Sequence, residues 1–189
     1  MPLTRPTKAD LEAARSRVLR DVIAPDLGVL FCGINPGLYS GAVGHHFARP
    51  GNRFWPALFA GGFTPRVLSP EEDGSLLDFG CGVTNLVART TASADELTLV
   101  ELVAGGARLS RKVARYRPRW VAILGIGAYR RTFDRPGAIA GVQPDLLARA
   151  EVWVLPNPSG LNASYQAPDL ERAFRRLREA AGMPDRSSR

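Results

Sequence analysis

The stretch FCGINPGLYSG (residues 31–41) carries an apolar strand directly into a constrained turn. The run 28–32 is short, apolar and typical of a buried strand. Gly33, Pro36 and Gly37 follow within five residues, and these residue types set the backbone shapes of tight turns. Asn35 places one uncharged polar side chain in the middle of this turn. The turn therefore raises the question of what Asn35 is held in place to do.

Apolar runs alternate with helical patterns along the rest of the chain. Continuous apolar sequence, typical of strands buried on both faces, occurs at 28–32, 81–87, 119–125 and 151–156. Helices are predicted at 8–20, 52–62, 69–80, 98–117 and 167–182. This alternation predicts an α/β fold around a mainly parallel sheet of about four strands. We expect a single domain over residues 8–182, with flexible ends at 1–7 and 183–189.

Composition favours a compact intracellular protein. The chain has 189 residues, of which 45% are hydrophobic, enough for one domain with a full core. No apolar run approaches the length that crosses a bilayer, and the charged N-terminus lacks the apolar segment of a signal peptide. We therefore expect a cytoplasmic protein with no membrane partner.

Cysteine and histidine usage gives no metal pattern. Cys32 and Cys81 lie in apolar runs, so buried thiols in a reducing compartment are expected. Two cysteines cannot supply a four-thiolate cluster, and the two histidines, His45 and His46, are adjacent and rarely converge on one ion. We expect neither a metal nor another cofactor.

The net positive charge favours a polyanionic partner. The formal charge is +7, and Lys8 and Lys112 are the only lysines among 25 cationic residues. Arginine forms the better fork for phosphate, so the composition favours a nucleic-acid partner. An ordinary solvated basic surface is the alternative.

The turns at the carboxyl ends of the strands are where an open α/β sheet binds its ligand. The predicted turns there are 33–51, 88–95, 125–137 and 156–166. Two of them, GINPG and PNPSGLNAS, each place an Asn-Pro pair beside glycine, and no Asp or Glu occurs between Gly33 and Pro70. Amides, backbone N–H groups and small residues in a basic protein suit a neutral or anionic ligand.

These residues resemble the mismatch-specific uracil-DNA glycosylases, in the thymine-DNA glycosylase branch of the uracil-DNA glycosylase superfamily. The resemblance runs from about Val22 to Leu177, through GVLFCGINPG, FARPGNRFW, GFTPR, CGVTNLV, AILG and VWVLPNPSGL. It implies a three-layer α/β/α domain that needs no cofactor. It further implies a monomeric enzyme that flips uracil, and some modified pyrimidines, out of G-mispaired duplex DNA and leaves an abasic site.

The resemblance also assigns roles to individual residues. Asn35 would position the attacking water, and Phe47 would stack on the flipped base. Base binding is implied for Gly33, Ile34, Ser40, Phe47 and Asn157, with backbone N–H groups near Ile34 and Phe47 meeting the base carbonyls. DNA contacts are implied for Ser159, Gly160, Leu161, Asn162 and Ser164, with Leu161 as the apolar wedge that fills the vacated position.

Two positions depart from the family pattern. Ala163 stands where family members often carry an arginine that contacts the widowed guanine, so the requirement for an opposite guanine is expected to be looser. Tyr39 stands where a small residue is common. Ser40 lies near the expected place of a thymine methyl, which predicts that thymine is a poor substrate.

An amide cannot take a proton as a carboxylate can, so an acid near the pocket is worth seeking. Glu96 has capping-box spacing with Ser93, which predicts that it faces a helix start, and an ion pair is predicted for Asp134. Asp95 is then the candidate catalytic acid beside Asn35. The alternative for Asp95 is an ordinary acid in the first turn of a helix.

Two other classes of function compete with this hypothesis. A non-catalytic nucleic-acid-binding α/β module would need the basic surface but not the turn around Asn35. A small-molecule nucleotide enzyme would need a phosphate loop, and neither glycine-rich phosphate motif occurs at a strand–helix junction. The segment 125–131, GIGAYRR, is the nearest match and is too short.

Overall fold

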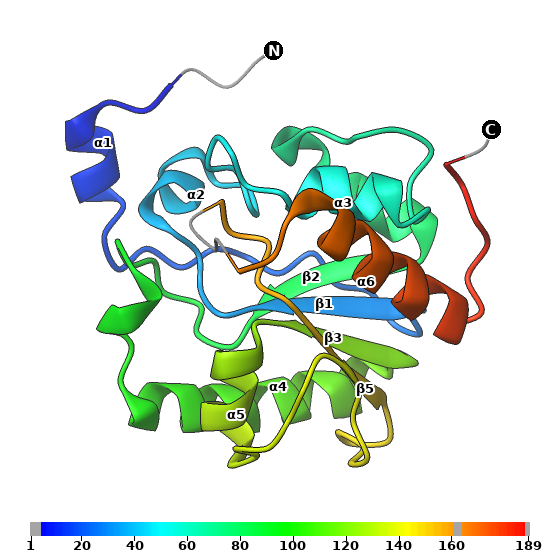
Figure 1. The fold of residues 1–189 in the computed structure, drawn as a ribbon. Coiled ribbons are helices and arrows are strands. Elements are labelled where there is room, and N and C mark those ends of the chain that lie inside the picture. The colour runs from blue at the N-terminus through cyan, green and yellow to red at the C-terminus, as the bar shows by residue number, and fades with distance from the viewer. Residues whose placement is uncertain (1–4, 161–163, 188–189) are drawn as a thin grey trace.

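A five-stranded sheet forms the centre of the protein (Figure 1). The computed structural model describes residues 5–160 and 164–187. Strand order is β2-β1-β3-β5-β4, with β1 Val29–Gly33, β2 Cys81–Asn85, β3 Trp120–Leu124, β4 Gly141–Val142 and β5 Glu151–Leu155. All neighbours are parallel except β4, which pairs antiparallel with β5. The predicted α/β class is confirmed, and the expected count of about four strands omitted only this two-residue edge strand.

Helices cover both faces of the sheet and make three layers (Figure 1). Helices α3 (Phe54–Ala60) and α6 (Ala167–Ala180) lie on one face with the 3₁₀ segment η1 (Pro70–Phe79). Helices α4 (Leu99–Tyr116) and α5 (Ile126–Phe133) lie on the other. Within β1, Phe31 packs into the first cluster and Leu30 into the second, as alternation along a strand requires. Burial on both faces explains why the strands are continuously apolar.

Several predicted boundaries are wrong for local reasons. Helix α1 spans only Lys8–Ala13 instead of 8–20, because Ser16 takes a left-handed backbone conformation with φ 65°. The predicted turn 33–51 contains α2 (Leu38–Val43), which ends at the left-handed Gly44. The predicted turn 125–137 contains α5, and the predicted helix 69–80 is the 3₁₀ segment η1. The short 3₁₀ turn η2 spans Ala94–Glu96.

The C-terminal segment 183–187, expected to be a flexible end, makes specific contacts. Arg178 donates to the carbonyl oxygen of Met183 at 3.0 Å and to the carboxylate of Asp185 at 3.3 Å. The backbone N–H of Arg186 donates to the carbonyl oxygen of Gly62 at 2.9 Å. These bonds join the segment to α6 and to the loop after α3.

Both cysteines are buried and form no disulfide, as predicted. Burial raises the pKa of the Cys81 thiol to about 12 and also raises the pKa of Cys32. Neither thiol is therefore ionised at neutral pH. In the described part of the chain, no helix is both long and apolar enough to span a membrane.

Candidate active site

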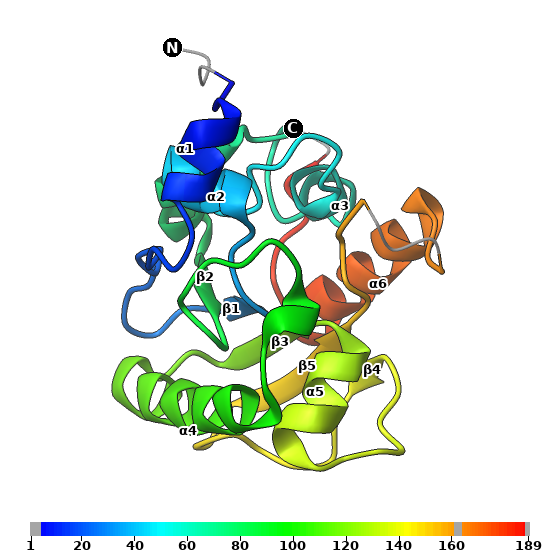
Figure 2. The same cartoon turned by 90° about the vertical axis from the view of Figure 1, so that its left-hand side faces the viewer.

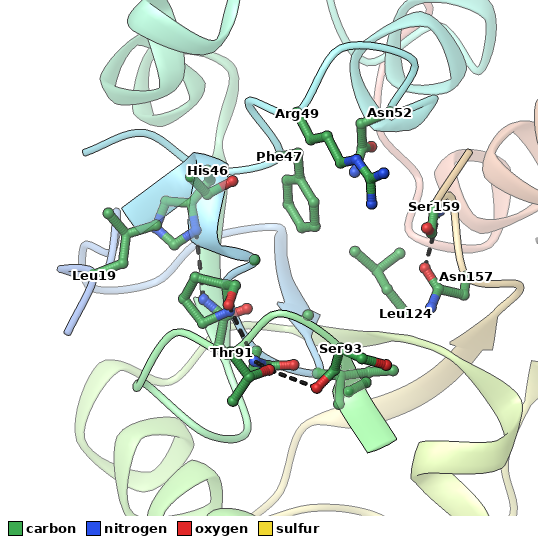
Figure 3. A pocket seen from close by; sticks show the side chains of 18 of the residues that line it. Leu19, His46, Phe47, Arg49, Asn52, Thr91, Ser93, Leu124, Asn157 and Ser159 are labelled. Carbon is green, nitrogen blue, oxygen red and sulfur yellow. Dashed lines mark hydrogen bonds between the residues drawn. The ribbon is translucent and has the colours of Figure 1, made fainter. Parts of the chain in front are cut away.

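A pocket of about 350 Å³ opens at the carboxyl ends of the parallel strands (Figure 3). Helices α2 and α5, which follow β1 and β3 at this edge of the sheet, face the viewer in Figure 2. The walls of the pocket come from segments that are far apart in the chain but leave the sheet at the same edge, as expected for an open α/β sheet. The lining residues lie at 33–37, 46–52, 91–95 and 157–159, with single contributions from Leu19, Ser40, Asn85 and Leu124. The two Asn-Pro turns therefore face one cavity.

Hydrogen bonds fix the side chain of Asn35 on the pocket wall. Its amide nitrogen donates to Thr91 Oγ1 at 2.7 Å and to the carbonyl oxygen of Pro36 at 3.0 Å. Thr91 in turn donates its hydroxyl to the carbonyl oxygen of Ser93 at 2.7 Å, and its backbone N–H bonds the Pro36 carbonyl (Figure 3). Because the anchoring bonds use the amide nitrogen, the carboxamide oxygen is the group of Asn35 suited to accept a hydrogen bond from a ligand or water.

Gly33 lets two side chains approach the backbone at the end of β1. A Cβ at this position would lie 2.5 Å from Oδ1 of Asn85 and 3.4 Å from Cζ of Phe47. The first distance is too short for any side chain, so glycine is required here for close approach. Asn85 is the last residue of β2 and is buried at the pocket floor.

Phe47 presents an aromatic ring to the pocket (Figure 3). Its ring stacks on Phe54 with centroids 4.1 Å apart and planes 26° apart, and its backbone is left-handed with φ 53°. Ser40, which is buried, accepts a hydrogen bond from the backbone N–H of Ala48 at 3.1 Å. Ser40 thus joins α2 to the loop that carries Phe47. Ile34 and Gly37 complete this side of the pocket.

The second Asn-Pro turn forms the opposite wall (Figure 3). Asn157 Oδ1 accepts the backbone N–H of Ser159 at 3.0 Å. Gly160 packs against the chain before α3, where a Cβ would lie 2.5 Å from the carbonyl oxygen of Gly51. Arg53 donates to the carbonyl oxygens of Ser159, at 2.8 Å, and Tyr165. One guanidinium therefore bridges two points of the segment 159–165.

The expected DNA-contacting residues fall partly outside the description. Ser159 lines the pocket, whereas Gly160 and Ser164 are exposed. Leu161 and Asn162, with Ala163, lie outside the described residues.

Asp95 is the one carboxylate among the described residues that line the pocket. It is exposed, and its Oδ2 accepts the hydroxyl hydrogen of Ser93 at 3.2 Å. Glu96 faces away into the helix cap, as predicted, and accepts the backbone N–H groups of Ala92 and Ser93 at 3.0 and 3.2 Å. Its other oxygen pairs with Arg15 at 3.2 Å.

Asp134 lies elsewhere, as the left-handed C-cap of α5. The ion pair predicted for it is instead made by Asp145, which lies 2.8 Å from Arg135. Within residues 5–160 and 164–187, no cluster of three or more His, Cys, Asp or Glu side chains could hold a metal ion.

Comparison with known families agrees with this geometry. The family model of the Uracil DNA glycosylase superfamily matches residues 20–180, which include every strand of the sheet and both Asn-Pro turns. The chain belongs to the uracil DNA glycosylase superfamily. Membership indicates a DNA glycosylase acting on uracil, with DNA as its partner.

Sequence reasoning missed several residues that line or support this pocket. Asn85 was placed inside a strand predicted to run to residue 87, whereas β2 ends at Asn85 itself. The available signal for Asn85 was its place as a polar residue at the end of an apolar run, which is also what marks Asn35 as a candidate site residue. His46 is buried, and nothing in its local sequence predicts that. Thr91 and Arg53 act through contacts with distant segments, which local patterns do not reveal.

Proposed function

We propose that this superfamily member is a mismatch-specific uracil-DNA glycosylase. It flips uracil, and some modified pyrimidines, out of G-mispaired duplex DNA and hydrolyses the bond between the base and the sugar. The observation that carries the proposal is the anchored amide of Asn35, whose nitrogen is held by Thr91 and Pro36 in a pocket that also contains Asp95. The enzyme acts as a monomer and lies with the DNA in the cytoplasm, or in the nucleoid of a bacterium.

The flipped base would enter between the ring of Phe47 and the floor at Asn85. Phe47 already stacks on Phe54, so a pyrimidine on its pocket side extends an existing aromatic stack. The amide of Asn85 supplies an acceptor and a donor to the polar edge of the base. Backbone N–H groups near Ile34 and Phe47, together with Asn157, bind the base carbonyls.

Bond cleavage leaves a cationic sugar and an anionic base, so the pocket must present water and tolerate both charges. The carboxamide oxygen of Asn35 accepts a hydrogen bond from the water and so orients it. Asp95, on the same pocket wall, takes the proton or stabilises the cation. A positioned carboxylate of this kind contributes roughly 10²–10⁴ to the rate.

Duplex binding would rely on the second Asn-Pro turn and on arginine. Ser159, Gly160 and Ser164, with Leu161 and Asn162, enter the gap left by the base, and Leu161 is the wedge. Arg49 lines the pocket and is exposed, so it is placed to meet a phosphate beside the flipped nucleotide. The net charge of +7 attracts the rest of the backbone.

Substrate preference follows from two positions. Ala163 replaces the arginine that contacts the widowed guanine in many relatives, so measurable activity on A·U pairs is expected beside G·U. Ser40 is buried in the wall and leaves thymine a poor substrate.

Alkali cleavage after incubation with uracil-containing DNA tests this proposal. The substrates are one sequence with a single uracil opposite G, opposite A or in a single strand, plus the same duplex with thymine opposite G. We expect strand cleavage with G·U, slower cleavage with A·U and little with G·T. Binding to all duplexes with no alkali-labile site in any of them would favour the non-catalytic binding module instead.

A further inference from the structure

His46 is buried in the pocket wall, and its ring lies between a backbone carbonyl and Asn85. Its Nε2 lies 2.9 Å from the carbonyl oxygen of Arg20, and its Nδ1 lies 3.5 Å from Nδ2 of Asn85. A carbonyl oxygen can only accept, so Nε2 must carry the hydrogen. Burial lowers the pKa of His46, which keeps the ring neutral near pH 7. In a neutral ring protonated on Nε2, Nδ1 is an acceptor.

This tautomer decides which way the amide of Asn85 points. With Nδ1 as an acceptor, Asn85 must present its Nδ2 hydrogens to His46, and its Oδ1 then faces the space above Gly33. Turning the amide over would place Oδ1 against the lone pair of Nδ1. The hydrogen bond between Asn85 and His46 is long, so it stabilises this orientation of the amide only modestly. The flipped orientation is further disfavoured because Oδ1 would repel the lone pair of Nδ1.

The orientation gives the pocket floor a definite polarity. Asn85 presents Oδ1 as an acceptor next to the second hydrogen of Nδ2 as a donor. This pair complements a base edge with an N–H beside a carbonyl, as in uracil. Cytosine presents the reverse, a ring nitrogen acceptor beside an amino group, and would meet acceptor with acceptor and donor with donor.

We propose that His46 is a positioning residue that fixes the amide of Asn85 through its Nε2–H tautomer, and so makes the pocket selective for pyrimidines with an imide edge over those with a cytosine edge. The selectivity rests on the proposed glycosylase function. The tautomer and the amide orientation do not, because they are set by Arg20, His46 and Asn85 alone.

Nitrogen NMR of the histidine rings tests the first step without any substrate. The chain contains only two histidines, His45 and His46, so a ¹⁵N-histidine sample gives two sets of ring signals, and a His45→Gln variant assigns them. We expect a neutral His46 protonated on Nε2 at pH 7.5. A ring protonated on Nδ1, or on both nitrogens, would overturn the proposal.

Excision rates for two substrates that differ in the target base test the second step. The substrates are 5-fluorouracil and 5-fluorocytosine, each opposite G. The shared fluorine makes both bases better leaving groups, and the two bases still present opposite donor and acceptor patterns to Asn85. His46→Gln can still donate to the Arg20 carbonyl and accept from Asn85, whereas His46→Phe can do neither. In single-turnover rates, we expect His46→Phe to reduce the preference for 5-fluorouracil by about tenfold and His46→Gln to retain it.

Three outcomes would count against the proposal. Equal losses on both bases in His46→Phe would mean that His46 only supports the fold. Loss of the preference in His46→Gln as well would mean that the donor and acceptor of His46 do not set it. Failure of the native chain to excise any uracil would overturn the proposed function, and the selectivity with it, whereas the tautomer is decided by the NMR measurement.

Discussion

At the scale of single residues, hydrogen bonds to neighbouring backbone and side-chain groups hold the amides of the pocket in place. Asn35 is anchored through its nitrogen, and Asn157 accepts the N–H of Ser159 through its oxygen. Asn35 and Asn157 could be predicted from sequence because each stands beside proline and glycine after a buried run. His46 and Asn85 could not, because their roles depend on a contact across 39 residues.

Substitutions at Asn35 and Asp95 separate the amide from the carboxylate. We expect Asn35→Ala to be nearly inactive, and Asp95→Ala to lose roughly 10²-fold in the single-turnover rate on G·U. Asp95→Asn keeps an acceptor for the Ser93 hydroxyl, so it controls for loss of the local turn and should be as slow as Asp95→Ala. Near-native rates for both Asp95 variants would remove Asp95 from the mechanism and leave it as a helix-start acid.

The burial of His46 predicts a pH-dependent stability. Its pKa is lowered from 6.5 by burial, against a raising effect from the Arg20 carbonyl and from Asp73 and Asp21, while His45 lowers it further. His46 therefore binds a proton more readily in the unfolded chain than in the folded one, so the free energy of unfolding falls as pH drops through about 6.5. Denaturant titrations between pH 5 and 8 should show this slope in the native chain and a smaller slope in His46→Gln.

The carboxylates Glu72 and Glu101 affect stability only at lower pH, so they do not contribute to the slope between pH 5 and 8. Hydrogen bonds from Arg66 and Arg89 hold the pKa values of Glu72 and Glu101 at about 2, from an ordinary 4.5. Their contributions are present above the ordinary value and fade only as pH falls towards 2. Identical slopes between pH 5 and 8 in the native chain and His46→Gln would show that His46 is not the group that titrates.

At the scale of elements, the sheet positions the site because its parallel strands all end at one edge. The strands were predictable from sequence within about two residues, since each is a continuous apolar run buried on both faces. Helices α2 and α5 were missed because each is short and contains glycine, which lowers helical propensity. Tertiary contacts stabilise them, such as the bond from Ala48 N–H to Ser40.

Arg53 connects two elements and is predicted to control duplex binding. Its guanidinium reaches the carbonyl oxygens of Ser159 and Tyr165 together, and a lysine, with one nitrogen, cannot reproduce this fork. We expect Arg53→Lys to raise KM on G·U duplex about tenfold and to change the rate on single-stranded uracil much less. The matched control is Arg115→Lys, at an exposed arginine near the C-terminal end of α4. Equal effects on duplex and single strand would reduce Arg53 to a stabilising residue.

At the scale of the whole molecule, a basic three-layer α/β/α protein has a pocket of about 350 Å³ at the sheet edge where such folds bind ligands. Charge, fold class and the two Asn-Pro turns were visible in the sequence, and the superfamily match to residues 20–180 agrees with them. The side chains that close the pocket floor could not be predicted, because their positions depend on how distant segments pack. That is why the turn around Asn35 was predictable and the contact between His46 and Asn85 was not.

Release of the base itself is the most direct measurement of the central claim. Excess enzyme is incubated with a G·U duplex in the presence of a chelator, and liberated uracil is quantified by mass spectrometry beside the Asn35→Ala variant. The account predicts one free uracil per duplex and an intact sugar–phosphate strand, with no release by Asn35→Ala. Tight binding of the duplex by the native chain with no uracil released would contradict it.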